Sequence, residues 1–199
     1  MTQFPVHPAP AAIDDMERTG GRTLLGTLRV NSTDAGPDHS AMMFFPVVRS
    51  GSDHALLVSA RLAARDHPYV RLELPLTPGG VELADVSRYT GVSFEARGEG
   101  VFRLLAHNYG LRSRDLYAAG FTVAGDWQTV RIPFSDLRRP APDAGAWNRR
   151  DVRALVFELS GSADSTAWLE LDNVRFYWKY WMRAVVACLA LAGARRVSV

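Results

Sequence analysis

The chain has 199 residues, 47% of them hydrophobic, and 23 Lys and Arg against 21 Asp and Glu leave a formal charge of +2. A chain of this length buries roughly 70% of its unfolded surface in one core, so a single domain needs neither disulfides nor metal for bulk stability. The scattered arginines exclude the phosphate-binding patch of a nucleic-acid-binding protein, and the one cysteine, Cys188, excludes an intramolecular disulfide.

The first eleven residues contain Pro5, Pro8 and Pro10 among small residues. Proline has no amide hydrogen, so this composition resists sheet ladders and predicts a flexible leader or a linker from a preceding domain over residues 1–11. The stretch has neither a basic segment nor an apolar run, so it does not resemble a secretory signal. A cytoplasmic location is therefore expected.

From residue 12 to residue 177, short apolar alternations recur between clusters of Gly, Pro, Asp and Ser. A period of two indicates strands rather than helices, so this region is predicted to be all-β with two packed sheets. The predicted strands are residues 23–30, 41–48, 55–62, 70–76, 91–97, 101–107, 127–133, 154–159 and 167–176.

The clearest alternation of apolar and polar side chains lies in residues 91–97 and again in residues 101–107. Gly98 and Gly100 stand between these two stretches, and glycine readily supplies the positive φ values of a tight connection. The two strands are therefore predicted to form a hairpin.

The strand predicted at residues 127–133 places Val130, Ile132 and Phe134 on one side. Pro133 cannot donate to a sheet ladder, so it is expected to mark a strand end or a sheet edge. A short helical turn is expected to follow it.

Several segments occur in an order that carries a family resemblance. They are residues 13–17, 89–94, 98–100, 126–130, 132–134 and 169–174. Their order and spacing resemble those of the complex I intermediate-associated protein family, which belongs with the galactose-binding-like domains. The resemblance covers residues 12–177 and implies a two-sheet jelly-roll sandwich, similar to many carbohydrate-binding modules. Two positions depart from the family pattern: Met16, where an aromatic residue is usual, and Asn173, where a second acid is frequent.

Three acidic side chains are candidate metal ligands. Asp15 and Glu17 lie one pleat apart on one face of the opening strand, and Asp172 lies in the closing strand. In the sandwiches that the chain resembles, the two ends are neighbours, so these oxygens could hold a structural calcium ion. The alternative is that the acids cap turns or pair with Arg22 or Arg175. No cofactor is required by either hypothesis.

Polar side chains on the non-core phase of several strands would form one surface if those strands are neighbours. Sugar-binding sandwiches use such a face, with hydrogen-bonding side chains for hydroxyl groups and aromatic rings for stacking. Tyr109, Tyr117 and Trp147 are the nearest aromatic candidates. The predicted ligand-binding residues are Arg71, Glu73, Glu95, Arg103, His107, Tyr109 and Glu158. The alternative is an ordinary solvent face with cross-strand ion pairs.

No catalytic motif is present: the five histidines stand apart, and the sequence contains no HExxH, no GxSxG and no phosphate-binding glycine loop. The expected function is non-catalytic binding, and the family resemblance implies protein assembly through a protein partner. The alternative is a glycan-binding module, for example an accessory domain of a hydrolase such as an amidohydrolase. A stand-alone enzyme using Glu95, His107 and Glu158 is the competing class.

Residues 178–199 break the sandwich pattern. Aromatic and basic residues at 178–183 precede an apolar run at 184–194, and eleven residues are too few to span a bilayer. The segment is expected to be a short helix that lies on a membrane surface or docks on protein, or an extension in which a second reading frame has been joined to the domain. A membrane-surface helix would make the location membrane-peripheral.

Overall fold

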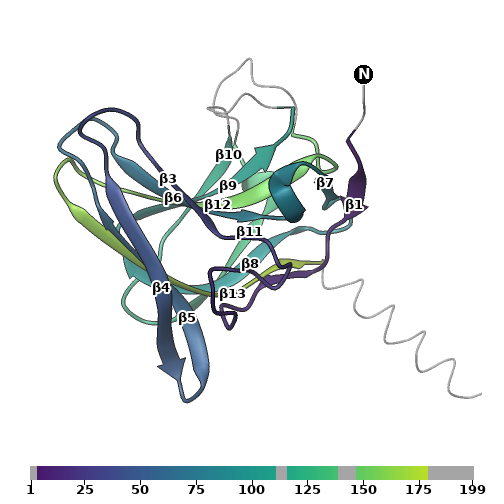
Figure 1. The fold of residues 1–199 in the computed structure, drawn as a ribbon, viewed down its shortest axis with the longest axis horizontal. Coiled ribbons are helices and arrows are strands. Elements are labelled where there is room, and N and C mark those ends of the chain that lie inside the picture. Colours follow the sequence, from purple (N-terminus) through teal and green to yellow (C-terminus); the bar gives the residue numbers. More distant parts are fainter. Residues whose placement is uncertain (1–3, 111–115, 139–146, 179–199) are drawn as a thin grey trace, which may run out of the picture.

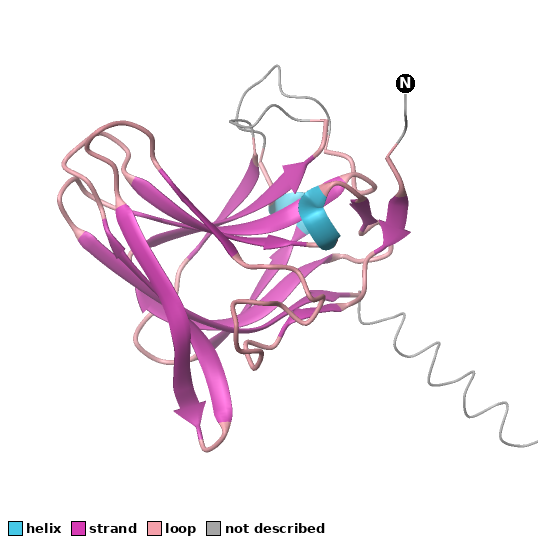
Figure 2. Cartoon of the chain, in the orientation of Figure 1, coloured by secondary structure: helices cyan, strands magenta, loops and turns pink. Residues whose placement is uncertain are grey.

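Strands make up almost all the regular structure of the described residues. The computed structural model describes residues 4–110, 116–138 and 147–178. The strands are β1 (Val6–Pro8), β2 (Ala12–Asp14), β3 (Val30–Thr33), β4 (Ala41–Ser50), β5 (Asp53–Arg61), β6 (Tyr69–Pro75), β7 (Leu83–Asp85), β8 (Gly91–Glu99), β9 (Val101–Asn108), β10 (Tyr117–Phe121), β11 (Gln128–Pro133), β12 (Val152–Ser160) and β13 (Thr166–Tyr177). Two helical turns, η1 (Pro78–Gly80) and η2 (Phe134–Asp136), are drawn in cyan in Figure 2.

The strands form two sheets that pack face to face (Figure 1). In sheet A, β3, β6, β12, β9 and β10 lie side by side, and β7 with its partner β1 continues from β12. Sheet B has the order β11–β8–β13–β5–β4, with β2 also beside β13. Every described pair is antiparallel except β1 with β7. The predicted all-β, two-sheet jelly-roll sandwich is therefore confirmed.

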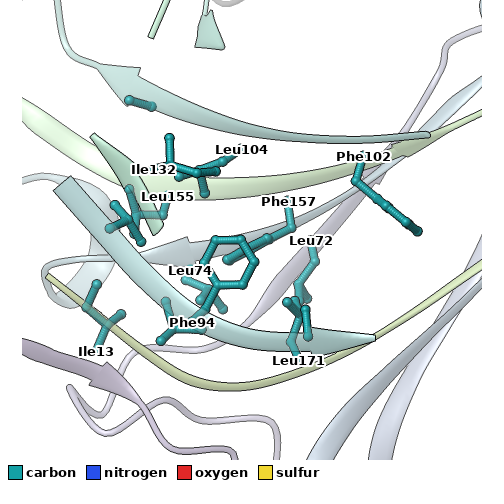
Figure 3. Packing of buried hydrophobic residues seen from close by; sticks show 14 of the residues in the cluster. Ile13, Leu72, Leu74, Phe94, Phe102, Leu104, Ile132, Leu155, Phe157 and Leu171 are labelled. Atoms are coloured by element: carbon teal, nitrogen blue, oxygen red, sulfur yellow. The ribbon is translucent and has the colours of Figure 1, made fainter. Parts of the chain in front are cut away.

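The core fills the space between the sheets because every second side chain of each inner strand points inward (Figure 3). Phe94 of sheet B meets Phe157 of sheet A edge to face, with ring centroids 5.0 Å apart. Leu72 and Leu171 are likewise fully buried, one from each sheet. Each such side chain contributes about 1.5–3 kcal/mol by leaving water.

The predicted hairpin at Gly98 and Gly100 is wrong. β8 pairs with β11 and β13 in sheet B, whereas β9 pairs with β10 and β12 in sheet A. The glycines serve a crossover between the sheets: a Cβ on Gly98 would lie 2.5 Å from the carbonyl oxygen of Trp168, and Gly100 has a φ of +147°. The alternation was identified correctly, but a tight glycine turn fits a crossover as well as it fits a hairpin.

Two other local predictions are also corrected. Residues 23–29 form turns instead of a strand, because the side-chain hydroxyls of Thr23 and Thr27 bond to each other at 2.7 Å and Thr27 also donates to the Pro75 carbonyl. Within the predicted leader, Val6–Pro8 forms β1, whose parallel pairing with β7 tolerates a proline at the strand end.

The prediction for residues 127–134 is confirmed. β11 is an edge strand and ends at Pro133, and the η2 turn follows directly. Ile132 and Phe134 are buried and Val130 packs against the core. The short C-terminal helix expected after residue 178 lies outside the described residues. Within the described part of the chain, no helix has the length and apolar character needed to cross a membrane.

Candidate functional site

The outer face of sheet B carries a group of aromatic and charged side chains that contact one another. On β8, β13 and the segment that enters β11, the residues out of phase with the core point to this face. They are Ser93, Glu95, Arg97, Trp127, Thr129, Arg131, Trp168, Glu170 and Asp172. We call the part around Trp127, made of Arg49, Glu95, Arg97, Trp127, Glu170 and Asp172, the Trp127 face.

The tip of the β4–β5 hairpin contacts the Trp127 face through Arg49. β5 pairs with β13 only as far as Leu56 opposite Leu171, and β2 takes its place beside β13 at Val174. The free end of the hairpin extends beyond the sheet (Figure 1). Near its tip, Arg49 bonds to Glu95 of β8, although β4 and β8 are three strands apart, about 14 Å in a flat sheet. The contact therefore shows that the hairpin tip turns toward β8 and does not continue a flat sheet.

Arg49 bonds to two carboxylates at the centre of this face. Its Nη1 donates to Glu95 and to Asp172, and the Asp172 side chain is 0% exposed. Burial raises the pKa of Asp172, against the opposing effect of the bonds from Arg49 and from the Asn173 amide. The three groups thus fix one another's positions and the position of the hairpin tip.

Trp127 lies between charged neighbours and is half-buried. The Arg49 guanidinium carbon lies 4.2 Å from the ring centroid and that of Arg97 lies 5.3 Å from it. Arg97 in turn binds Glu170 through two hydrogen bonds, of 2.8 and 3.1 Å. Cations over an indole stabilise its orientation, so the ring is held in place before any ligand arrives.

Apolar side chains border the face on the side of β4. Trp168 is partly exposed and lies opposite Ser59 of β5, which in turn faces Met43 of β4. Met43 and Phe45 are 63% and 42% exposed. Exposed aromatic and apolar groups beside paired charges are typical of a binding surface.

On the other side, a groove of about 460 Å³ runs beside β2. Its lining includes Ser93, Glu95, Thr129, Arg131, Asn173 and Arg175. Because Glu95 belongs to both the groove and the Trp127 face, the two form one continuous surface along β8.

Of the predicted ligand-binding residues, only Glu95 lies on this surface. Arg71, Arg103 and Glu158 come together on the opposite side of the molecule, on the outer face of sheet A. Glu158 is 1% exposed and accepts from Arg71 Nε at 2.9 Å and from Arg103 Nε at 2.8 Å. The sequence analysis predicted correctly which side chains of each strand point away from the core. This alternation does not tell which of the two sheets a strand joins.

The remaining predicted residues are also on or near sheet A. Glu73 accepts from Ser32 at 3.3 Å. His107 lies nearby, where burial lowers its pKa despite the opposing charge of Glu73. Tyr109 is 48% exposed and contacts Phe4, with ring centroids 4.9 Å apart. These residues remain predicted ligands without a shared groove.

Tyr117 and Trp147, the other aromatic candidates, pack inward. Tyr117 is buried, and Trp147 meets Phe134 edge to face at 4.7 Å. Sheet A also buries Leu105 and Val156 on its outer side, so this face is partly apolar and covered.

The predicted calcium ligands do not form one group. The opening and closing strands are neighbours as predicted, with Asp14 opposite Val174. Asp15 accepts from the Glu17 amide, Glu17 binds His54 at 3.0 Å, and Asp172 binds Arg49. Among the described side chains, no group of three or more His, Cys, Asp or Glu is arranged to hold a metal ion. Calcium binding stays a prediction for which these residues offer no ready site.

Trp127, Trp168 and Arg49 were missed by the sequence analysis. A signal existed for two of them: Val130 and Ile132 point inward, so Trp127 falls on the outward phase, and Trp168 is outward by the same count. Arg49 could not be found this way, because its role depends on the bend of the hairpin.

No family model and no curated protein matches the chain. Solved structures do match. A family 11 carbohydrate-binding module from Clostridium thermocellum, in complex with a β-1,3-1,4-mixed-linked tetrasaccharide, has 17% identity and a TM-score of 0.63, covering 86% of this chain and 97% of that one. A family 30 module of a cellulosomal cellulase from the same organism has 14% identity and a TM-score of 0.54, covering 88% and 96%. An agarase has 13% identity and a TM-score of 0.51, covering 85% of this chain and 26% of the enzyme.

These likenesses define the class of fold: a two-sheet jelly-roll sandwich of the kind found in these carbohydrate-binding modules. At such identities they show the fold and no more. The resemblance to the complex I intermediate-associated family gains no support from the comparisons.

Proposed function

We propose that this chain is a non-catalytic carbohydrate-binding domain whose ligand lies on the Trp127 face. The observation that carries the proposal is the position of Trp127 on the outer face of sheet B, held by Arg49 and Arg97. Similar folds supply the second support, since one of them is a carbohydrate-binding module in complex with a tetrasaccharide.

The chemistry of the face suits a sugar chain. An indole ring offers a flat apolar surface to the C–H face of a pyranose ring, and the charged groups around it can bond to hydroxyls. The Arg97 guanidinium has five N–H donors, and Glu170 accepts from two of its nitrogens, so further donors remain for a ligand. Because the ion pairs already hold these side chains in one geometry, little rotamer entropy is lost on binding.

The test is calorimetric titration of the full chain with soluble polysaccharides, including mixed-linkage β-glucan, xyloglucan and xylan. Wild-type protein is expected to bind at least one of them, and Trp127→Ala to weaken that binding about 30-fold or more, as for a buried aromatic anchor. The matched control is Tyr109→Ala, which removes an exposed aromatic ring on the sheet A side and should leave affinity unchanged.

Two results would overturn this assignment. Silence of the wild-type protein across a broad glycan panel would remove the function itself. Loss of binding in Tyr109→Ala or Arg103→Ala, with Trp127→Ala unaffected, would move the site to the outer face of sheet A.

We also propose that the domain acts as an accessory unit of a larger hydrolase system, because a similar fold makes up about a quarter of an agarase. Fusion to a heterologous glycanase and measurement of its activity on insoluble substrate would test this. Enhancement that disappears with Trp127→Ala supports the proposal. The role in protein assembly is not proposed further, since the comparisons give it no support.

A further inference from the structure

Asn173 interrupts the regular alternation of β13. The register between β13 and β8 shifts between Asp172 and Arg175. Asn173 and Val174 therefore stand together opposite the single residue Phe94, and two residues facing one define a β-bulge. Since Val174 is buried in the core, Asn173 is the extra residue of the bulge.

The bulge brings the side chain of Asn173 to the outer side of sheet B. In an uninterrupted strand, the residue after the outward-facing Asp172 would point to the core. Asn173 is instead half-buried and lines the groove beside β2. Its Oδ1 accepts a hydrogen bond of 3.2 Å from Arg175, and its Nδ2 lies 3.4 Å from Oε2 of Glu95. The amide nitrogen is therefore the group turned toward Glu95.

The backbone of the bulge does not require an asparagine. Asn173 has a φ of +52°, in the left-handed region that glycine adopts at no steric cost. The bond that its backbone N–H donates to Asp172, at 2.6 Å, would form with glycine as well. A side chain carried in an unfavourable conformation, on a bulge beside a binding surface, indicates a role for that side chain.

Asn173 and Glu95 both have hydrogen-bonding capacity left for a ligand. The Nδ2 of Asn173 has two N–H donors, and its described bond, to Glu95, is long. In Glu95, Oε2 accepts from Arg49, while Oε1 has no hydrogen-bond partner among the described residues. The Glu95 side chain is 32% exposed. A donor and an acceptor thus stand side by side, which suits two neighbouring hydroxyl groups, one accepting from the amide and one donating to the carboxylate.

This pair lies close to the ring on which a sugar would stack. Glu95 is two residues from Arg97 on β8, about 7 Å along the strand, and Arg97 lies over the Trp127 ring. Arg49 contacts the same ring and also bonds to Glu95. A polysaccharide with one sugar on Trp127 therefore presents its next sugar to Glu95 and Asn173.

We propose that Asn173 is a ligand-binding residue, which together with Glu95 holds two neighbouring hydroxyl groups of the sugar beside the one on Trp127. This inference rests on the proposed function and names the groups of the ligand that this part of the site recognises. Asp172 lies beneath the pair and is 0% exposed, so it supports the bulge without reaching the ligand.

The experiment measures calorimetric affinity of the full chain for whichever of mixed-linkage β-glucan, xyloglucan and xylan the wild-type protein binds most tightly. Asn173→Gly should weaken binding about fivefold, the effect of one lost hydrogen bond, while the unfolding temperature stays equal or rises because glycine accepts this φ. Asn173→Asp tolerates the same φ but has no N–H donor and places a second carboxylate beside Glu95, so it should weaken binding at least as much. The matched control is Asp164→Gly, at an exposed loop position with a φ of +56°, which should bind as the wild type does.

A partly O-acetylated form of the same polymer tests the pair of hydroxyl groups. Acetylation should weaken binding to the wild-type protein, and the ratio of the two affinities should be smaller in Asn173→Gly, because that variant has already lost one of the contacts that acetylation removes. An equal ratio in the two proteins would show that Asn173 does not bind these hydroxyls, and would overturn the inference.

The other failures are also distinct. Wild-type affinity in either Asn173 variant overturns the inference while the proposed function stands. Loss of affinity with faster hydrogen exchange at residues 170–176 shows that the side chain only holds the bulge, and an equal loss in Asp164→Gly shows that such a change anywhere loosens the domain. Both results overturn the inference. No binding of the wild-type protein to any glycan overturns the proposed function and the inference together.

Discussion

The two outer faces of the sandwich both carry arginine–carboxylate ion pairs, but these pairs have different surroundings. On sheet A, Glu158 is buried beneath Arg71 and Arg103, and its two oxygens are both occupied. On sheet B, the ion pairs of Arg49 and Arg97 surround a half-exposed indole and open onto a groove. Charged side chains on a sheet face therefore indicate a binding site only where their ion pairs hold an accessible group, such as the indole of Trp127, in position.

The β4–β5 hairpin distinguishes the two faces. It leaves sheet B beyond Leu171, and Arg49 near its tip bonds to Glu95 of β8 on the outer face. The outer side of sheet A instead buries Leu105, Ala154 and Val156 in a small apolar cluster with Leu116 and Ala118. We therefore expect stability to depend more on the charges of sheet A, and binding on those of sheet B.

The largest effect on stability is expected from Glu158→Ala. The change leaves Arg71 and Arg103 without their shared carboxylate and should lower the free energy of unfolding by about 2–3 kcal/mol. This loss is small for a broken buried ion pair, because both arginine side chains reach solvent. Urea unfolding measures it. Glycan affinity of the folded variant should equal that of the wild type. A variant as stable as the wild type, or one that loses binding while folded, would break the division between the faces.

A smaller loss of stability, with a loss of binding, is expected from Arg49→Ala. Asp172 would keep only the Asn173 amide as a partner, and one unpaired buried carboxylate costs about 1–3 kcal/mol. The hairpin tip would also be released from β8. Hydrogen exchange should therefore speed up at residues 47–54 and stay unchanged in β12, and affinity should fall. Unchanged hydrogen exchange at residues 47–54 would show that Arg49 does not hold the hairpin tip against β8.

Much of the fold could be predicted from the sequence, because strand alternation is local. Val92, Phe94 and Ala96 are buried as their spacing requires, and Pro133 ends an edge strand because it has no amide hydrogen. The pairing of those strands was not local. Gly98 permits both a hairpin and a crossover, and the choice between them depends on contacts with Trp168, which lies 70 positions away.

The site was less predictable for the same reason. Glu95 and Arg103 have the same outward phase on consecutive strands, yet they lie on opposite sides of the molecule because the chain changes sheets between them. Trp127 could have been found by counting back from Ile132. The contact of Arg49 with Glu95 depends on the turn of the hairpin tip toward β8, which no spacing in the sequence encodes.

The smallest effect is expected from the titration of Asp172, at the centre of the Trp127 face. Its pKa is raised by burial, so the folded state binds a proton more readily than the unfolded state does. Stability contributed by this group is therefore highest when it is protonated and falls as the pH rises from about 4 through the folded-state pKa.

Asp172→Asn mimics the protonated form. The stability of this variant relative to wild type should rise between pH 4 and pH 7, measured by urea unfolding. A relative stability of Asp172→Asn that instead falls with pH would mean that Arg49 outweighs burial, and that the centre of the Trp127 face is held together by charge alone.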